Sequence, residues 1–128
     1  MNEFIILLSM IFMHIVDDYY LQGILANMKQ KKWWKLHEPD KLYQYDYIAA
    51  LIFHAFSWTF AIHIPIFILH ILKYISLSAP ITIALFIANI IIHAYVDNLK
   101  ANKHEINLIM DQSIHLIQIM GIWVVYFI

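Results

Sequence analysis

Three pairs of histidine and aspartate, each four residues apart, stand inside hydrophobic segments of this chain. The pairs are His14 with Asp18, His93 with Asp97, and Asp111 with His115. Residues four apart lie on the same face of a helix, about 6 Å apart along its axis. Imidazole nitrogens and carboxylate oxygens suit Zn²⁺, Mn²⁺ or Fe²⁺, and the chain has no cysteine to offer sulfur. The pattern therefore predicts a divalent-metal site.

The predicted ligand set draws on four hydrophobic segments, because a further segment contains His54. The candidate metal ligands are His14, Asp18, His54, His93, Asp97, Asp111 and His115. A tetrahedral zinc ion takes four ligands or fewer from a protein, so seven candidates are too many for one ion. Two arrangements remain open. Either two ions lie about 3.5–4 Å apart and share a carboxylate, or one ion is bound and the remaining groups orient its ligands and act as a general base.

Other polar residues near these pairs suit supporting roles. Asp18 and Asp111 are the candidates for a catalytic general base. The candidates for orienting ligands or holding a substrate are Gln22, Gln112 and Lys100. Lys100, close after Asp97, would meet an anionic group at the membrane surface or serve as an ordinary cytoplasmic lysine. Asp17 points about 100° away from Asp18 on a regular helix, and the sequence leaves open which of the two carboxylates faces the site.

The composition predicts the elements that must position these residues. The chain has 128 residues, of which 62% are hydrophobic and 13% charged, and a soluble domain of this size has too little interior to bury so much apolar surface. Its four hydrophobic runs, near residues 4–25, 47–71, 80–99 and 106–127, are each long enough for a helix to cross about 30 Å of hydrocarbon. We expect an all-α, four-helix transmembrane bundle that forms a single domain over residues 1–128, with the first run retained as a span.

The lysines predict how the bundle is oriented. Five lie in the connection between the first two spans, two between the last two, one between the middle two, and none near the termini. Short lysine-rich loops remain in the cytoplasm, so both termini should lie outside a multi-pass protein of the inner (cytoplasmic) membrane. With that orientation, all the His and Asp positions fall toward the cytoplasmic end of the spans.

The first connection also suits contact with membrane lipids. Trp33 and Trp34 stand among its lysines, and residues 27–36 are expected either as a short helix on the membrane surface or as a solvated loop. No extended basic face is present, which disfavours nucleic-acid binding. The sequence leaves open whether the protein forms a homo-oligomer.

The energetics favour a metal over purely structural contacts. An aspartate at mid-membrane costs roughly 2.5–3.5 kcal/mol on insertion scales, while polar contacts between transmembrane helices return only about 0.6 kcal/mol on average. A divalent cation would compensate the carboxylates and orient the imidazoles. His63 and His70 lie outside the pairs, and we interpret them as packing residues.

The four-part pattern resembles the domain of unknown function 3307 family of small phage and bacterial membrane proteins. The matching residues are His14, Asp18, Tyr19, Leu21, Gln22 and Lys29 in the first helix and the connection after it, then His54, then His93, Asp97, Leu99 and Lys100, then Asp111, Gln112 and His115. At position 17 this family usually has a small or neutral residue, whereas this chain has Asp17. A looser similarity exists to SOS-regulated membrane-bound metal-dependent hydrolases, and it implies metal chemistry only by analogy.

Three functions are compatible with these residues. The first is a membrane-embedded metal-dependent hydrolase that acts at the cytoplasmic headgroup level on a phosphoester or lipid-linked substrate. The second is a phage-encoded membrane effector, such as a superinfection-exclusion factor, in which the metal is structural. The third is a transporter of metal ions or protons. The sequence identifies neither the substrate nor the metal.

Overall fold

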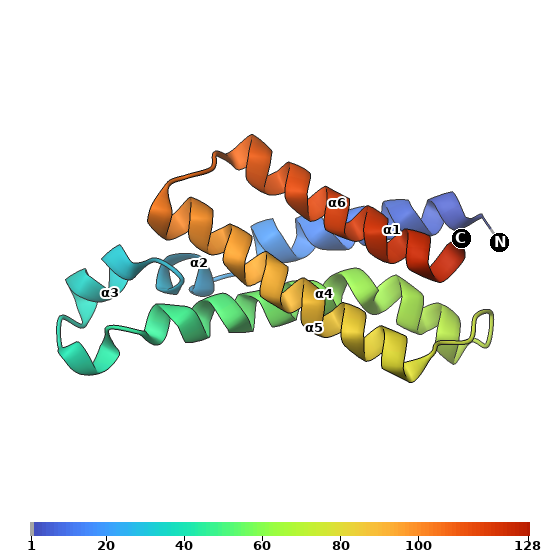
Figure 1. Cartoon of the computed structure of the whole chain (residues 1–128), viewed down its shortest axis with the longest axis horizontal. Helices are drawn as coiled ribbons and strands as arrows, with labels where there is room; N and C mark the ends of the chain where they lie inside the picture. The colour runs from blue at the N-terminus through green and yellow to red at the C-terminus, as the bar shows by residue number, and fades with distance from the viewer. Residues whose placement is uncertain (1) are drawn as a thin grey trace.

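The computed structural model describes residues 2–128, and within that range it contains helices and no strand. Its four long helices are α1 (Glu3–Val16), α4 (Asp46–Ile71), α5 (Ala79–Asn98) and α6 (Leu108–Phe127). The π-helical turns η1 (Asp17–Leu21) and η3 (Leu99–Lys103) extend α1 and α5. The short helices α2 (Leu25–Met28), α3 (Lys31–His37) and η2 (Lys41–Tyr43) connect α1 to α4. Both termini lie at one end of the bundle, and α2, α3 and the α5–α6 connection lie at the other (Figure 1).

Four helices are long and apolar enough to cross a membrane, which confirms the number of spans predicted from the sequence. Side chains on the outside of the bundle are apolar on every long helix; Phe12, Phe53, Ile91 and Ile117, one from each, are all exposed. Helices that are apolar on their outward faces as well as inside are typical of a bilayer environment.

Local sequence explains where the helices begin and end. The side chain of Asn2 accepts a hydrogen bond from the Phe4 amide and caps α1, and Asn107 caps α6 in the same way.

The first span ends at Leu21, earlier than the predicted residue 25, because Gly23 has a positive φ of 54° that stops the helix. The surface segment expected over residues 27–36 is helical, but it is divided between α2 and α3.

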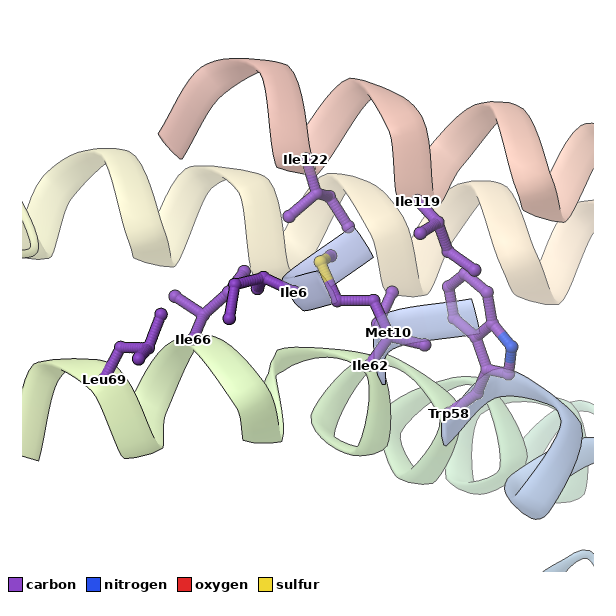
Figure 2. Packing of buried hydrophobic residues seen from close by; sticks show 8 residues of the cluster. All are labelled: Ile6, Met10, Trp58, Ile62, Ile66, Leu69, Ile119 and Ile122. Carbon is purple, nitrogen blue, oxygen red and sulfur yellow. The ribbon is translucent and has the colours of Figure 1, made fainter. Parts of the chain in front are cut away.

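A hydrophobic core fills the half of the bundle nearer the termini. Its buried members are Ile6, Met10, Trp58, Ile62, Ile66, Leu69, Ile119 and Ile122, which come from α1, α4 and α6 (Figure 2). Trp58 lies where this core meets the buried polar residues, and its ring stacks on His93 with 4.2 Å between centroids. The core therefore closes one end of the polar cluster.

Candidate metal centre

The structure brings all seven predicted ligands into one connected cluster. They come from the four long helices and η1: His14 and Asp18 from the first span, His54 from α4, His93 and Asp97 from α5, and Asp111 and His115 from α6. Each of the seven has a side-chain nitrogen or oxygen atom that lies 3.2–3.7 Å from a nitrogen or oxygen atom of another member. Six of the seven are fully buried, and Asp18 is largely buried.

His54 lies at the centre of the first group of ligand atoms. Its Nε2 atom is 3.2 Å from Asp18 Oδ1, 3.2 Å from His93 Nε2 and 3.4 Å from Asp97 Oδ2. A tetrahedral ion with bonds of 2.0–2.1 Å separates its ligand atoms by about 3.3 Å. These spacings therefore match the edges of a metal coordination shell, and Asp18, His54 and His93 form one group that could hold an ion.

A second group forms around His115. Its Nε2 atom is 3.4 Å from Asp97 Oδ1 and 3.5 Å from Asp111 Oδ1. His93, Asp97 and His115 are also close enough together to hold an ion. Asp97 lies beside both His54 and His115, because its Oδ2 atom faces the first histidine and its Oδ1 atom faces the second.

His14 lies beside these groups and orients them. Trp58 donates its indole N–H to His14 Nδ1 over 2.7 Å, so the proton of a neutral His14 is on Nε2. His14 Nε2 then donates to Gln112 Oε1 at 3.0 Å. This fixes the amide of Gln112, whose Nε2 donates to Asp18 Oδ2 at 3.3 Å and to Asp111 Oδ2 at 3.0 Å. Both His14 nitrogens are thus engaged, and the residue positions two carboxylates.

The other two predicted supporting residues differ in their contacts. Lys100 donates to Asp111 Oδ2, so it belongs to the cluster. Gln22 donates to the backbone carbonyl of Asp18 over 2.6 Å, which is a local contact within one helical turn. Among residues 2–128, Gln22 has no hydrogen bond to a side chain of the cluster.

A buried ion pair that the sequence pattern did not predict joins Lys29 to Asp97, with 2.6 Å between Nζ and Oδ2. Asn102 of η3 holds Lys29 in place, because its side chain donates to the Lys29 carbonyl and accepts from the Lys31 amide. In the sequence, Lys29 contributes to the prediction of membrane orientation. The one signal for a role in the site is its place in the family motif.

Asp17 also enters the cluster. Its Oδ1 accepts from Ser57 at 2.6 Å, and its Oδ2 lies 3.7 Å from His54 Nδ1. The 100° offset from Asp18 turns Asp17 toward α4 instead of toward lipid, because the first span packs against α4 as well as α6. Both carboxylates therefore face the site, and His54 lies between them.

The charges and unpaired atoms of the cluster fit a cation. Four buried or largely buried aspartates against two lysines, Lys29 and Lys100, leave two formal negative charges when the imidazoles are neutral. Asp18 Oδ1, Asp111 Oδ1 and His115 Nε2 are buried and have no hydrogen-bond partner in the described part of the chain. Leaving such atoms unpaired is costly. A divalent cation would balance the charge and bind these atoms.

No protein-family model, curated protein or solved structure matches this chain. The resemblance to the domain of unknown function 3307 family, which rests on the motif residues alone, therefore stays a prediction.

Proposed function

We propose that this protein is a membrane-embedded metal-dependent hydrolase that acts on a phosphoester or lipid-linked substrate. The observation that supports this most is the group of Asp18, His54 and His93, whose carboxylate oxygen and two imidazole nitrogens are close enough together to hold an ion inside a bundle of apolar helices. A bound divalent cation would activate water and polarise a phosphoryl oxygen. The candidate metals are Zn²⁺, Mn²⁺ and Fe²⁺.

The side chains divide the remaining work. Asp18 and Asp111 are our candidates to accept a proton from the attacking water, each through the carboxylate oxygen that an ion leaves free. Lys100, which is partly exposed, would approach an anionic group of the substrate. Gln112 holds both bases through its amide. If His54, His93, Asp18 and Asp97 all bind one ion, a tetrahedral zinc site would be closed, so Mn²⁺ or Fe²⁺, which accept more ligands, fit a catalytic role better.

A groove between α1 and α6 supports a substrate that arrives from the lipid. It has a volume of about 480 Å³ and is lined by apolar side chains that include Ile15, Tyr20 and Leu116. His14 and Gln112 also line it, and these two residues are hydrogen-bonded to each other next to Asp18 and Asp111. The groove thus leads from the lipid-facing surface to His14 and Gln112, which lie between it and the candidate bases.

The proposed reaction would take place at the cytoplasmic side of the inner membrane. Seven of the eight lysines belong to the segments at the end of the bundle opposite the termini (Figure 1). The positive-inside rule assigns this end to the cytoplasm. The polar cluster lies in the halves of the spans that lead to this end, while the hydrophobic core fills the other halves.

Reporter fusions test this orientation. We expect alkaline phosphatase fused after Ile128 to be active, because it folds only outside the cytoplasm, and green fluorescent protein at the same position to be dark. The same reporters inserted after His104 should give the reverse pattern. A fluorescent C-terminal fusion would contradict the assignment of the lysine-rich end to the cytoplasm.

Transport is less well supported than hydrolysis. A conducting path would have to pass through the half of the bundle nearer the termini. There Met10, Trp58, Ile62 and Ile119 are completely buried and pack together (Figure 2). His63 is a buried polar residue of this half, but its Nδ1 bonds to the Thr59 carbonyl of its own helix, and we therefore favour chemistry at one side of the membrane.

Hydrolysis can be tested with protein reconstituted in vesicles that contain a lipid phosphomonoester and supplied with Mn²⁺. We expect phosphate release by the wild-type protein. Leu116→Trp should fill the groove and lower the rate with the lipid substrate about 10-fold or more, because one misplaced ångström can cost that much. The rate with a small water-soluble phosphoester should change little.

Ile117→Trp is the matched control, because Ile117 is an exposed neighbour that does not line the groove. Loss of activity in both tryptophan variants would contradict entry through the groove. Failure of the metal-loaded protein to hydrolyse any phosphoester, lipid or soluble, would contradict the proposed hydrolase.

A further inference from the structure

We propose that the centre binds two divalent ions bridged by Asp97, an arrangement that suits a phosphomonoester dianion as substrate. The first ion would lie among His54, His93, Asp18 and Asp97 Oδ2. The second would lie among His115, Asp111 and Asp97 Oδ1. This inference rests on the proposed metal-dependent hydrolase and specifies its metal number and substrate class.

The carboxylate of Asp97 is placed to bridge. Its Oδ2 is 3.4 Å from His54 Nε2 and 3.9 Å from His93 Nε2, whereas its Oδ1 is 3.4 Å from His115 Nε2. Each oxygen therefore faces a different set of imidazole nitrogens. Carboxylate bridges of this kind hold pairs of ions about 3.5–4 Å apart in two-metal hydrolytic sites. Because Lys29 also contacts Oδ2, the bridging carboxylate is fixed from a third side.

A hydrogen bond at Nδ1 of His115 leaves the lone pair of its Nε2 atom available to the second ion. The Gln118 amide donates to Asn89 Oδ1 at 2.9 Å, so its Oε1 is the acceptor that faces His115 Nδ1 at 3.1 Å. A neutral His115 therefore has its proton on Nδ1 and an unprotonated Nε2. Metal-binding histidines are commonly held in this way, with the second ring nitrogen donating to an oxygen.

Two carboxylate oxygens then face the histidine nitrogen at this position. His115 Nε2 lies 3.4 Å from Asp97 Oδ1 and 3.5 Å from Asp111 Oδ1. Asp111 and His115 are completely buried. Neither Asp111 Oδ1 nor His115 Nε2 has a hydrogen-bond partner within residues 2–128. An ion would bind all three atoms, and a proton shared by His115 is the alternative occupant.

The charge balance points to the substrate. Four aspartates and two lysines leave two formal negative charges, so two divalent ions would turn this into two positive charges. A phosphomonoester dianion would neutralise that excess. Its oxygens could take the coordination positions that three or four protein ligands leave free on each ion. A phosphodiester, with one negative charge, would balance only half of it.

Metal stoichiometry tests the second ion. The purified protein is loaded with Mn²⁺, freed of excess metal, and analysed for manganese per chain. We expect a ratio of two for the wild type and of one for Asp111→Asn and for His115→Gln. We also expect the electron paramagnetic resonance signal of a coupled manganese pair in the wild type and that of an isolated ion in both variants.

His63→Ala is the control, because His63 is a buried histidine that bonds to the Thr59 carbonyl and lies outside both groups. The His63→Ala variant should still bind two manganese ions per chain. One manganese per chain in the wild type would contradict the second ion but not the proposed hydrolase. A proton on His115 would then occupy the second position. A wild-type ratio of zero would overturn both. Because the wild-type ratio decides, the test does not depend on how well the variants fold.

Discussion

Replacing His93 with alanine is expected to remove the metal and to weaken metal affinity at least about 100-fold, since loss of even a supporting residue costs 10–100-fold. His93 belongs to both groups that could hold an ion. Its Nε2 lies 3.2 Å from His54 Nε2, and its ring is enclosed by those of Trp58 and His115. Metal titration followed by isothermal calorimetry measures the loss.

His63→Ala again provides the comparison, because it removes an equally buried imidazole from α4. We expect His63→Ala to keep the metal affinity of the wild type, because His63 lies outside both groups that could hold an ion. Circular dichroism checks that both variants remain helical. Equal metal affinity in the wild type and in a folded His93→Ala variant would contradict the assignment of His93 as a ligand.

Replacing Lys29 with methionine is expected to destabilise the metal-free protein by about 3–5 kcal/mol, the cost of breaking a buried ion pair from one side. Lys29 is buried and lies 2.6 Å from Asp97 Oδ2, so its removal leaves the buried carboxylate of Asp97 without its lysine partner. Metal should reduce the loss, because a cation compensates the same carboxylate. Thermal unfolding in detergent, with and without Mn²⁺, measures both effects.

Lys32→Met is the matched control, because Lys32 is an exposed lysine of the same segment. This substitution should change the free energy of unfolding by no more than about 0.5 kcal/mol. The double variant Lys29→Met, Asp97→Asn should recover part of the stability lost in Lys29→Met, since it removes the uncompensated charge. If Lys29→Met and Lys32→Met unfold at the same temperature, the buried ion pair does not stabilise the bundle.

The four helices could be predicted from the sequence because their length and apolar composition are local properties. The ends of the helices were less predictable. The π-helical turns η1 and η3 have no clear signal in the sequence, and the early end of the first span depends on the backbone of Gly23. Orientation in the membrane still rests on the lysine distribution alone.

The composition of the cluster was predictable for a different reason. Residues four apart on an α-helix share a face, so each His/Asp pair was expected to point in one direction, and the directions converge in the structure. Lys29 and Asp17 could not be assigned this way. Lys29 reaches Asp97 because Asn102 of η3 holds the first connection against the end of α5. Asp17 depends on the first span having neighbours on two sides.

The most direct measurement is anomalous X-ray scattering from crystals of the protein grown with Mn²⁺. We expect a peak at the manganese edge between His54 and His93, about 2.0–2.3 Å from their Nε2 atoms and from an oxygen of Asp18, given the bond lengths usual for nitrogen and oxygen ligands. Manganese bound only outside the bundle, or no peak inside the bundle at saturating Mn²⁺, would contradict the metal centre and the hydrolase built on it.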